Sequence, residues 1–354
     1  MKLKLFIATC LLISVSLHAQ DAAQFVKEGI ALHDQGAYAQ AIEKYNEALK
    51  LNPTYWNANY EIAYSYSALK EYEKTIAAAD LAIKYCEEKD RLYPYIIKGS
   101  ALDDMGNTQE SVNFYRHALK EFPDNYLLLY NYALSCTRLG DIPEAEKSLV
   151  KGLQNNLSHA SSHLLLANIK LDNNQKLFGA MGLYFFLMLE SNSARSNAEV
   201  LKLKKLIYGS SSDKEGNKNI VISLPDGKAD SKTGAAELMF SLLGFASDEI
   251  DKTIKGNDGR TEQQKFVDDT KKLFSTLKEL SQNSKESKKK KSKTSEENFW
   301  WGNYVPFYSA LNDAGHTEAF CYLIMQSYKS EEVSFWLAQN KEKLEFFYLW
   351  LEGK

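Results

Sequence analysis

Apolar residues recur every three to four positions along the first half of the chain, which predicts amphipathic helices. Small residues recur over a much longer distance. One column of small residues, whose members are 34, 36, 34 and 34 positions apart, is Gly29, Ala63, Gly99, Ala133 and Ala167. A second column with the same spacing is Ala41, Thr75, Ser111, Ala145 and Gly179. Because small residues let two helices approach closely, this period predicts an array of packed helical hairpins.

Turn residues stand between the two small columns, once in each period. These positions are Gly36, Lys70, Gly106, Gly140 and Asn174. In addition, Pro53 and Pro123 close the first and third periods. Each period is therefore predicted to be a helix, a tight turn and a second helix.

The period and its columns resemble those of the tetratricopeptide repeat (TPR) family, whose unit is a pair of antiparallel helices. The first unit carries, at the family's spacings, Phe25, Gly29, Leu32, Gly36, Tyr38, Ala41, Tyr45, Ala48 and Pro53. The resemblance covers about residues 22–192, although the fifth unit departs from it with Lys170 in an apolar column and Phe186 in a small one. It implies an all-α fold, a TPR α-solenoid of about five hairpins followed by a helical C-terminal region.

The resemblance also implies that the first helices of the units line a concave groove that binds a protein or peptide. Side chains on these helices outside the packing columns would then face the partner. The predicted partner-binding residues are Tyr60, Tyr64, Tyr93, Ile96, Leu127, Tyr130, Leu134 and Arg138, and the equivalent positions elsewhere are Ile30, His33, Asn57 and Asp103. A tyrosine offers a large apolar face with a polar tip, which suits recognition of a peptide. The alternative is that these tyrosines pack against later helices.

The second half of the chain has no such period. Residues 177–189 are all apolar or glycine; this run is too short to span a membrane and predicts a helix buried on all sides by later segments. Residues 195–283 predict further helices around a polar loop, with one small strand at 219–224. Residues 284–298 are rich in lysine and predict a solvated linker, with an anionic-surface patch as the alternative.

Residues 299–354 are predicted to form helices rich in aromatic residues, and they contain four of the five Trp. One helical face carries Trp300, Tyr304, Phe307, Tyr308 and Leu311. Aromatic stripes at helical spacing are predicted to be mostly core, with some forming an interaction patch. An aromatic helical tail after TPR units resembles a group of secreted TPR proteins of Gram-negative envelopes, for which no defined activity is implied.

The first residues have the layout of a secretory signal peptide. Lys2 and Lys4 precede the apolar run 5–15, and Ala19 ends a short exit segment. This pattern predicts removal of residues 1–19 and export to the periplasm, with association with the outer membrane as a further option. Lipidation at Cys10 is the weaker alternative, because a threonine precedes that cysteine.

Few residues point to chemistry. The net charge of −3 excludes a broadly basic surface for nucleic acid. The cysteines beyond the signal, Cys86, Cys136 and Cys321, have apolar or aromatic neighbours and are interpreted as buried free thiols, with oxidation of one pair as the alternative. His159 and His163 have a spacing that metal sites use, but no third ligand is near, so a surface or packing role is favoured. Since the chain lacks phosphate-loop, nucleophile-elbow and paired-cysteine motifs, we predict no catalytic residue, cofactor or metal.

Together these features predict a non-catalytic protein–protein interaction scaffold or adaptor in the bacterial cell envelope. It would bind a partner segment in the concave TPR groove. The alternative function is that of an accessory subunit of an outer-membrane or cell-wall complex, engaged through residues 299–354. A third option, a hydrolase acting on cell-wall material, has no motif behind it.

Overall fold

The computed structural model describes residues 21–208, 233–242, 259–283 and 299–353. Within these residues the chain is built of helices, turns and loops, with no strand. The predicted signal peptide, the strand at 219–224, the polar loop and the lysine-rich linker lie outside the described residues. Among the helices that are described, none combines the length and apolar character of a membrane span.

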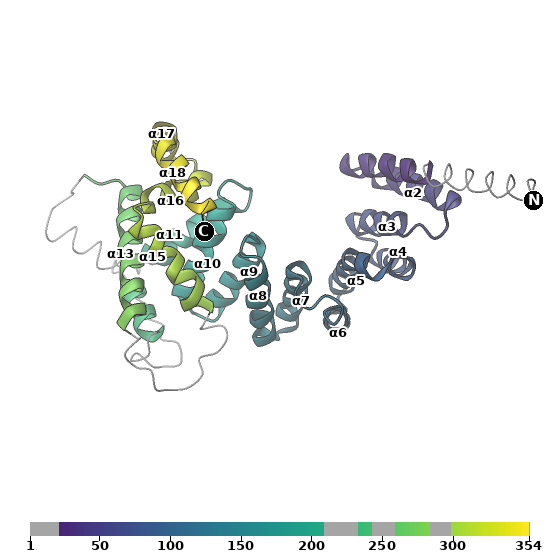
Figure 1. Cartoon of the computed structure of the whole chain (residues 1–354), viewed down its shortest axis with the longest axis horizontal. Coiled ribbons are helices and arrows are strands. Elements are labelled where there is room, and N and C mark those ends of the chain that lie inside the picture. The colour runs from purple at the N-terminus through teal and green to yellow at the C-terminus, as the bar shows by residue number, and fades with distance from the viewer. Residues whose placement is uncertain (1–20, 209–232, 243–258, 284–298, 354) are drawn as a thin grey trace, which may run out of the picture. The chain divides into compact units, whose positions relative to one another are not determined.

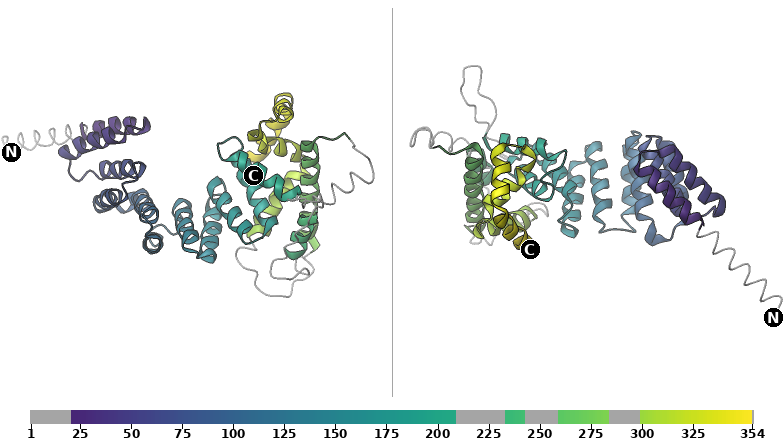
Figure 2. Two further views of the ribbon diagram at one scale, coloured as in Figure 1. Left: turned by 180° about the vertical axis from the view of Figure 1, so that it is seen from behind. Right: turned by 90° about the horizontal axis from the view of Figure 1, so that it is seen from above.

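The chain divides into two compact units, Met1–Asn155 and Asn156–Lys354. This division falls inside the predicted repeat array 22–192, between its fourth and fifth hairpins. Figures 1 and 2 show both units. The predicted domain boundaries themselves remain a prediction.

The first unit is a series of helical hairpins. Its helices are the helix at 21–34, α2 (Tyr38–Leu51), α3 (Trp56–Ala68), α4 (Tyr72–Tyr85), α5 (Leu92–Asp104), α6 (Thr108–Ala118), α7 (Tyr126–Leu139) and α8 (Ile142–Asn155). Each helix from α2 onward contacts the next, and α5 also contacts both α3 and α7. First helices therefore pack on first helices of neighbouring hairpins, as a repeat array requires.

The turn column adopts one conformation in all five hairpins. The φ angles are +77° at Gly36, +59° at Lys70, +92° at Gly106, +87° at Gly140 and +60° at Asn174. A left-handed residue ends the first helix and reverses the chain, and glycine adopts this conformation without a steric penalty. The predicted helix–turn–helix units are thus confirmed, with Lys70 and Asn174 held in a conformation that side chains disfavour.

Size complementarity explains the two glycines of the first small column. A Cβ added to Gly29 would lie 2.3 Å from Cε1 of Tyr45, and one added to Gly99 would lie 2.3 Å from Cζ of Tyr115. Both tyrosine rings are fully buried, and the hydroxyl of Tyr115 donates to the Ile96 carbonyl at 2.9 Å. Each glycine therefore makes the space that a tyrosine on the second helix of the same hairpin fills.

The second unit surrounds one apolar helix. Its helices are α9 (Ala160–Asp172), α10 (Lys176–Leu189), α11 (Ser196–Tyr208), the helix at 233–242, α13 (Glu262–Asn283), the π-helical turn η4 (Trp300–Tyr304), α15 (Val305–Asp313), α16 (Thr317–Ile324), α17 (Glu331–Gln339) and α18 (Lys341–Glu352). Residues 177–187 of α10 are all buried. The predicted cover over this helix is therefore confirmed.

Aromatic side chains from distant segments supply that cover. The ring centroid of Tyr184 lies 5.5 Å from Phe274, 6.0 Å from Tyr308 and 5.8 Å from Phe320. The hydroxyl of Tyr184 lies 2.8 Å from Oγ1 of Thr270, so its polar tip is satisfied inside the core. The aromatic stripe predicted on residues 300–311 is core as well, with only Phe307 half-buried.

A buried carboxyl group caps the N-terminal end of α10. The amide of Leu177 donates to both oxygens of Glu237, at 3.0 and 2.9 Å. Burial raises the pKa of Glu237 to about 7, although these backbone hydrogen bonds oppose the shift. A carboxylate at this position satisfies free amides at the positive end of the helix dipole. It also ties the helix at 233–242 to α10.

Candidate functional site

Four aromatic rings on the first helices of three successive hairpins form a row, which we call the ring row: His33, Tyr64, Tyr60 and Tyr93. The rings of His33 and Tyr64 stack with centroids 4.6 Å apart and planes 14° apart. The centroids of Tyr64 and Tyr60 are 6.3 Å apart, and those of Tyr60 and Tyr93 are 6.4 Å apart. The row therefore runs continuously from the helix at 21–34 over α3 to α5.

Two of the four rings, those of Tyr64 and Tyr93, are open to solvent. Tyr64 is 48% exposed and Tyr93 is 54% exposed, whereas Tyr60 is half-buried. Tyr60 packs against the buried core of the first hairpins, which fixes the middle of the row. Nδ1 of His33 lies 2.8 Å from Oγ of Ser65, so the ring at one end is also held in place. The row is thus an anchored, partly exposed apolar surface, the kind that binding partners bury.

A carboxyl group that the sequence prediction missed lies beside the row. Burial, and then the nearby charge of Asp34, raise the pKa of Glu61 to about 7. Burial, and then the charge of Glu61, raise the pKa of Tyr60 to about 12. No ion pair joins Glu61 to another of the described residues. The sequence did contain a signal for this group, because Glu61 is an acidic residue within a run of apolar and aromatic residues.

The other predicted partner-binding residues occupy α5 and α7. Ile96, Leu127, Tyr130 and Leu134 are half-buried. Arg138 is exposed and donates to Asp103 at 2.7 Å and to Asp104 at 2.9 Å. These side chains are available on the same series of first helices as the ring row, and their role in binding stays a prediction.

Asp103, predicted to face the groove, is buried instead. Its Oδ2 accepts hydrogen bonds from Ser135 Oγ at 2.9 Å and from Arg138. Ser135 also lies 3.0 Å from the hydroxyl of Ser111, which donates to the Gly99 carbonyl at 2.8 Å. Asp103 thus belongs to a polar network that joins the third and fourth hairpins, because a buried carboxylate must be hydrogen-bonded.

The candidate metal residues have structural roles. His163 is fully buried, with Nδ1 bonded to the hydroxyl of Tyr304 and Nε2 lying 2.7 Å from the Leu157 carbonyl. Burial lowers the pKa of His163 to about 3, so the ring is neutral. His159 precedes α9 and bonds Ser162 at 2.7 Å. No group of three His, Cys, Asp or Glu that could hold a metal occurs in the described part of the chain.

The three cysteines beyond the predicted signal peptide, Cys86, Cys136 and Cys321, are buried free thiols, as predicted. Burial raises the pKa of Cys136 to about 11 and that of Cys321 to about 12. Both side chains are therefore protonated thiols, which are poor nucleophiles.

Two segments of the chain match family models. Residues 29–77 match the TPR repeat model, and residues 98–173 match the tetratricopeptide repeat model. These two segments of the chain are tetratricopeptide repeats. TPR domains bind protein partners, and the TPR fold is typically a non-catalytic scaffold.

Several solved structures are similar to this chain. A thermophilic TPR protein of Thermus thermophilus is 17% identical, with 51% of this chain and 96% of that chain covered and a TM-score of 0.44. PilF of Pseudomonas aeruginosa is 14% identical, with 68% and 95% covered and a TM-score of 0.46. PilW, a widely conserved type IV pilus biogenesis factor, is 17% identical, with 70% and 97% covered and a TM-score of 0.43. No curated protein sequence matches this chain significantly.

Proposed function

We propose that this TPR protein is a non-catalytic scaffold that binds a segment of a protein partner along the ring row. The observation that carries the proposal is the contrast between two sets of tyrosines in the repeats. Tyr45 and Tyr115, which pack on glycines of the first small column, are fully buried, whereas Tyr64 and Tyr93 are exposed. Exposed rings that neighbouring rings already hold in place lose little side-chain entropy when a partner covers them.

The chemistry of the row indicates the kind of segment that would bind. Flat aromatic faces favour apolar or aromatic side chains of the partner. Glu61 adds an acidic group whose ionised form is disfavoured in the free protein. A lysine or arginine of the partner placed near it would stabilise the carboxylate, so we expect a segment that combines apolar anchors with a cation.

Site-specific cross-linking tests where the partner binds. A photoreactive phenylalanine analogue is placed at Tyr64 or, as a matched control, at Leu81, an exposed residue on α4, a second helix of a hairpin. We expect a cross-linked partner segment from position 64 and none from position 81. Cross-linking at both positions to the same extent would contradict binding at the row.

Affinity measurements with the identified segment as a synthetic peptide give the second test. Tyr64→Ala and Tyr93→Ala should each weaken binding by about 1–3 kcal/mol, as expected for aromatic anchors. Tyr130→Ala tests whether the binding surface extends to α7, and Leu81→Ala is the control. Unchanged affinity in the Tyr64, Tyr93 double variant would exclude the ring row as the site.

We propose further that the scaffold works in the bacterial cell envelope, on the strength of the predicted signal peptide at residues 1–19. Cell fractionation should find the protein in the periplasmic fraction, with its N-terminus at Gln20. A variant that lacks residues 2–19 should remain in the cytoplasm. If the N-terminus is instead a lipidated Cys10, the protein is a lipoprotein anchored to the outer membrane, and cleavage after Ala19 is excluded.

The alternative function is that of an accessory subunit engaged through the C-terminal aromatic region. Burial of most of these aromatic residues leaves only a small part of the region available to a partner. Residues 299–305 are buried apart from Gly302 and Asn303, and residues 319–325 are all buried, so deletion of the whole region would unfold the second unit. Exposed aromatic rings are left on α17 and α18, where Phe335 is 68% and Phe346 is 65% exposed. A Phe335→Ser, Phe346→Ser variant that loses an envelope complex while keeping its ring-row partner would favour this alternative.

A further inference from the structure

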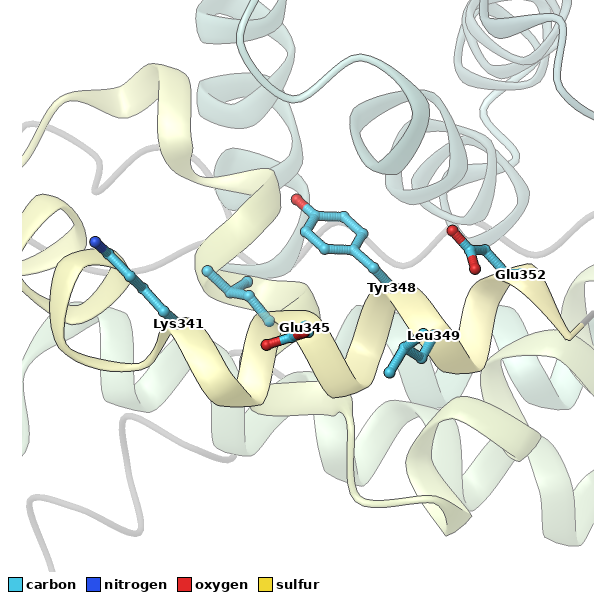
Figure 3. A pocket seen from close by; sticks show the side chains of 6 residues that line it. Lys341, Glu345, Tyr348, Leu349 and Glu352 are labelled. Atoms are coloured by element: carbon cyan, nitrogen blue, oxygen red, sulfur yellow. The ribbon is translucent and has the colours of Figure 1, made fainter.

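An unusual face of α18 is the basis of a further inference, which does not depend on the ring row. A shallow depression of about 360 Å³ is lined by residues of this helix alone, namely Lys341, Leu344, Glu345, Tyr348, Leu349 and Glu352. Tyr348 and Leu349 lie between Lys341 at one end of the helix and Glu352 at the other (Figure 3). Leu349 is 58% exposed. This set of six residues is called the α18 stripe.

The α18 stripe has the same spacing read in either direction along the chain. Its members stand at i, i+3, i+4, i+7, i+8 and i+11, which is one face of an α-helix. If two such helices lie antiparallel, Lys341 of one copy falls opposite Glu352 of the other. Leu344 then falls opposite Leu349, and Glu345 falls opposite Tyr348, whose hydroxyl can donate to the carboxylate. The stripe is therefore complementary to itself.

The charges at the ends of α18 are placed unfavourably for a helix that stays alone. Lys341 is its first residue and Glu352 is its last, so each charge stands at the end of the helix dipole that has the same sign. Neither Lys341 nor Glu352 forms an ion pair with any described residue. A second antiparallel copy would bring an opposite charge, and an opposite dipole end, to both positions.

We propose that the α18 stripe binds a second copy of this chain, with the two α18 helices antiparallel across a two-fold axis. A closed pair is the expected outcome, because each contact occurs twice and no stripe is left to recruit a third copy. A helix of twelve residues is about 18 Å long, so the contact is at the small end of protein interfaces and the dimer is weak. Association in the micromolar range is therefore expected.

Charge reversal provides the sharpest test. In a homodimer of the Lys341→Glu variant, each of the two symmetric contacts places a glutamate opposite a glutamate. In a homodimer of the Glu352→Lys variant, each places a lysine opposite a lysine, so both variants replace attraction with repulsion. Each variant should dissociate at least about tenfold more readily than the wild type in sedimentation velocity from about 1 to 200 µM. Lys205→Glu, the same charge change at an exposed position on α11, should dimerise like the wild type.

Complementation then distinguishes this arrangement from any other dimer. A mixture of the two single variants places the new glutamate at position 341 of one chain opposite the new lysine at position 352 of the other. The mixture should therefore dimerise where each variant alone does not. The double variant Lys341→Glu, Glu352→Lys should dimerise by itself. Because restoration requires folded α18 helices, it also excludes unfolding as the cause of the single-variant defect.

The outcomes that overturn the proposal are distinct. If the wild-type protein is monomeric throughout the concentration range, the proposed dimer does not exist. A dimer that survives the single reversals, or that the mixture does not restore, places the contact on another face. A monomer that co-sediments with anionic phospholipid vesicles, and loses this on Leu349→Ser, assigns the stripe to a lipid surface instead.

Discussion

Tyrosines of the first unit and aromatic residues of the second unit are buried for different reasons. In the first unit, burial follows the position within the repeat: Tyr45 and Tyr115 each pack on a glycine of the first small column and are fully buried. In the second unit, Tyr304 and Tyr308 are equally buried because segments more than 100 residues earlier contact them. In a repeat array, the position of a residue within the repeat therefore determines whether its side chain is buried. In a unit without a repeat, contacts with residues distant in the sequence determine it.

Truncation of one tyrosine in each unit should give the largest contrast. Tyr308→Ala removes a fully buried ring and should destabilise the second unit by about 3–5 kcal/mol. Tyr64→Ala removes an exposed ring and should change stability by about 0.5 kcal/mol or less. Hydrogen exchange of amides in α10 and α3, measured in each variant, reports the two units separately. If the Tyr308→Ala and Tyr64→Ala variants lost amide protection to the same extent, the proposed distinction between core and surface tyrosines would be wrong.

The size match between Gly99 and Tyr115 predicts the next largest effect. Gly99→Ala should destabilise the first unit by about 1–3 kcal/mol, because the new Cβ would overlap a ring that cannot move. Gly152→Ala is the matched control, since its Cβ would meet Leu129 Cβ at an ordinary 3.5 Å. Alanine is the better helix former, so the control should be neutral or stabilising. Denaturant unfolding measures both, and equal effects would show that the small column does not act through close packing.

Glu61 predicts a pH dependence that the repeat columns do not reveal. Its folded pKa of about 7 exceeds its ordinary value of 4.5, so the native state holds an extra proton between these values and stability falls as the pH rises through this window. Glu61→Gln should therefore stabilise the first unit at about pH 8, by about 1 kcal/mol once partial solvation is allowed for, and should have no effect at about pH 4. Thermal melts at the two pH values test the sign. Destabilisation at the higher pH would mean that the ionised carboxylate contributes to the fold.

The turn column predicts the smallest effect. Lys70→Gly should stabilise the protein by about 0.5–1 kcal/mol, because relief of the left-handed conformation exceeds the entropy that glycine adds to the unfolded chain. Gly106→Lys makes the reverse change at the same position of the next hairpin and should destabilise by a similar amount. Denaturant titrations of the two variants and the wild type measure both changes in the free energy of unfolding. A loss of stability in Lys70→Gly would mean that the lysine side chain makes a favourable contribution of its own.

Positions that recur in every repeat were predicted best from the sequence, because each repeat gives information about the equivalent positions of the others. Five turn positions were predicted from glycine at three of them, and all five are left-handed. Asp103 shows the limit of this reasoning: its position predicted exposure, but hydrogen bonds from Ser135 and Arg138 hold it in the interior. The ring row was predicted residue by residue, yet its continuity depends on contacts between hairpins that a single repeat cannot specify.

The sequence by itself determined the helical hairpins, their turns and the buried character of α10, because spacing and side-chain size act locally or between adjacent repeats. Only the tertiary structure decided which segments cover α10, why Glu237 caps it, and which aromatic residues of α17 and α18 stay exposed. The first two of these outcomes depend on contacts between residues that are 60 to 127 positions apart. No local pattern encodes such contacts, since the free energy that selects them comes from the packing of the whole unit.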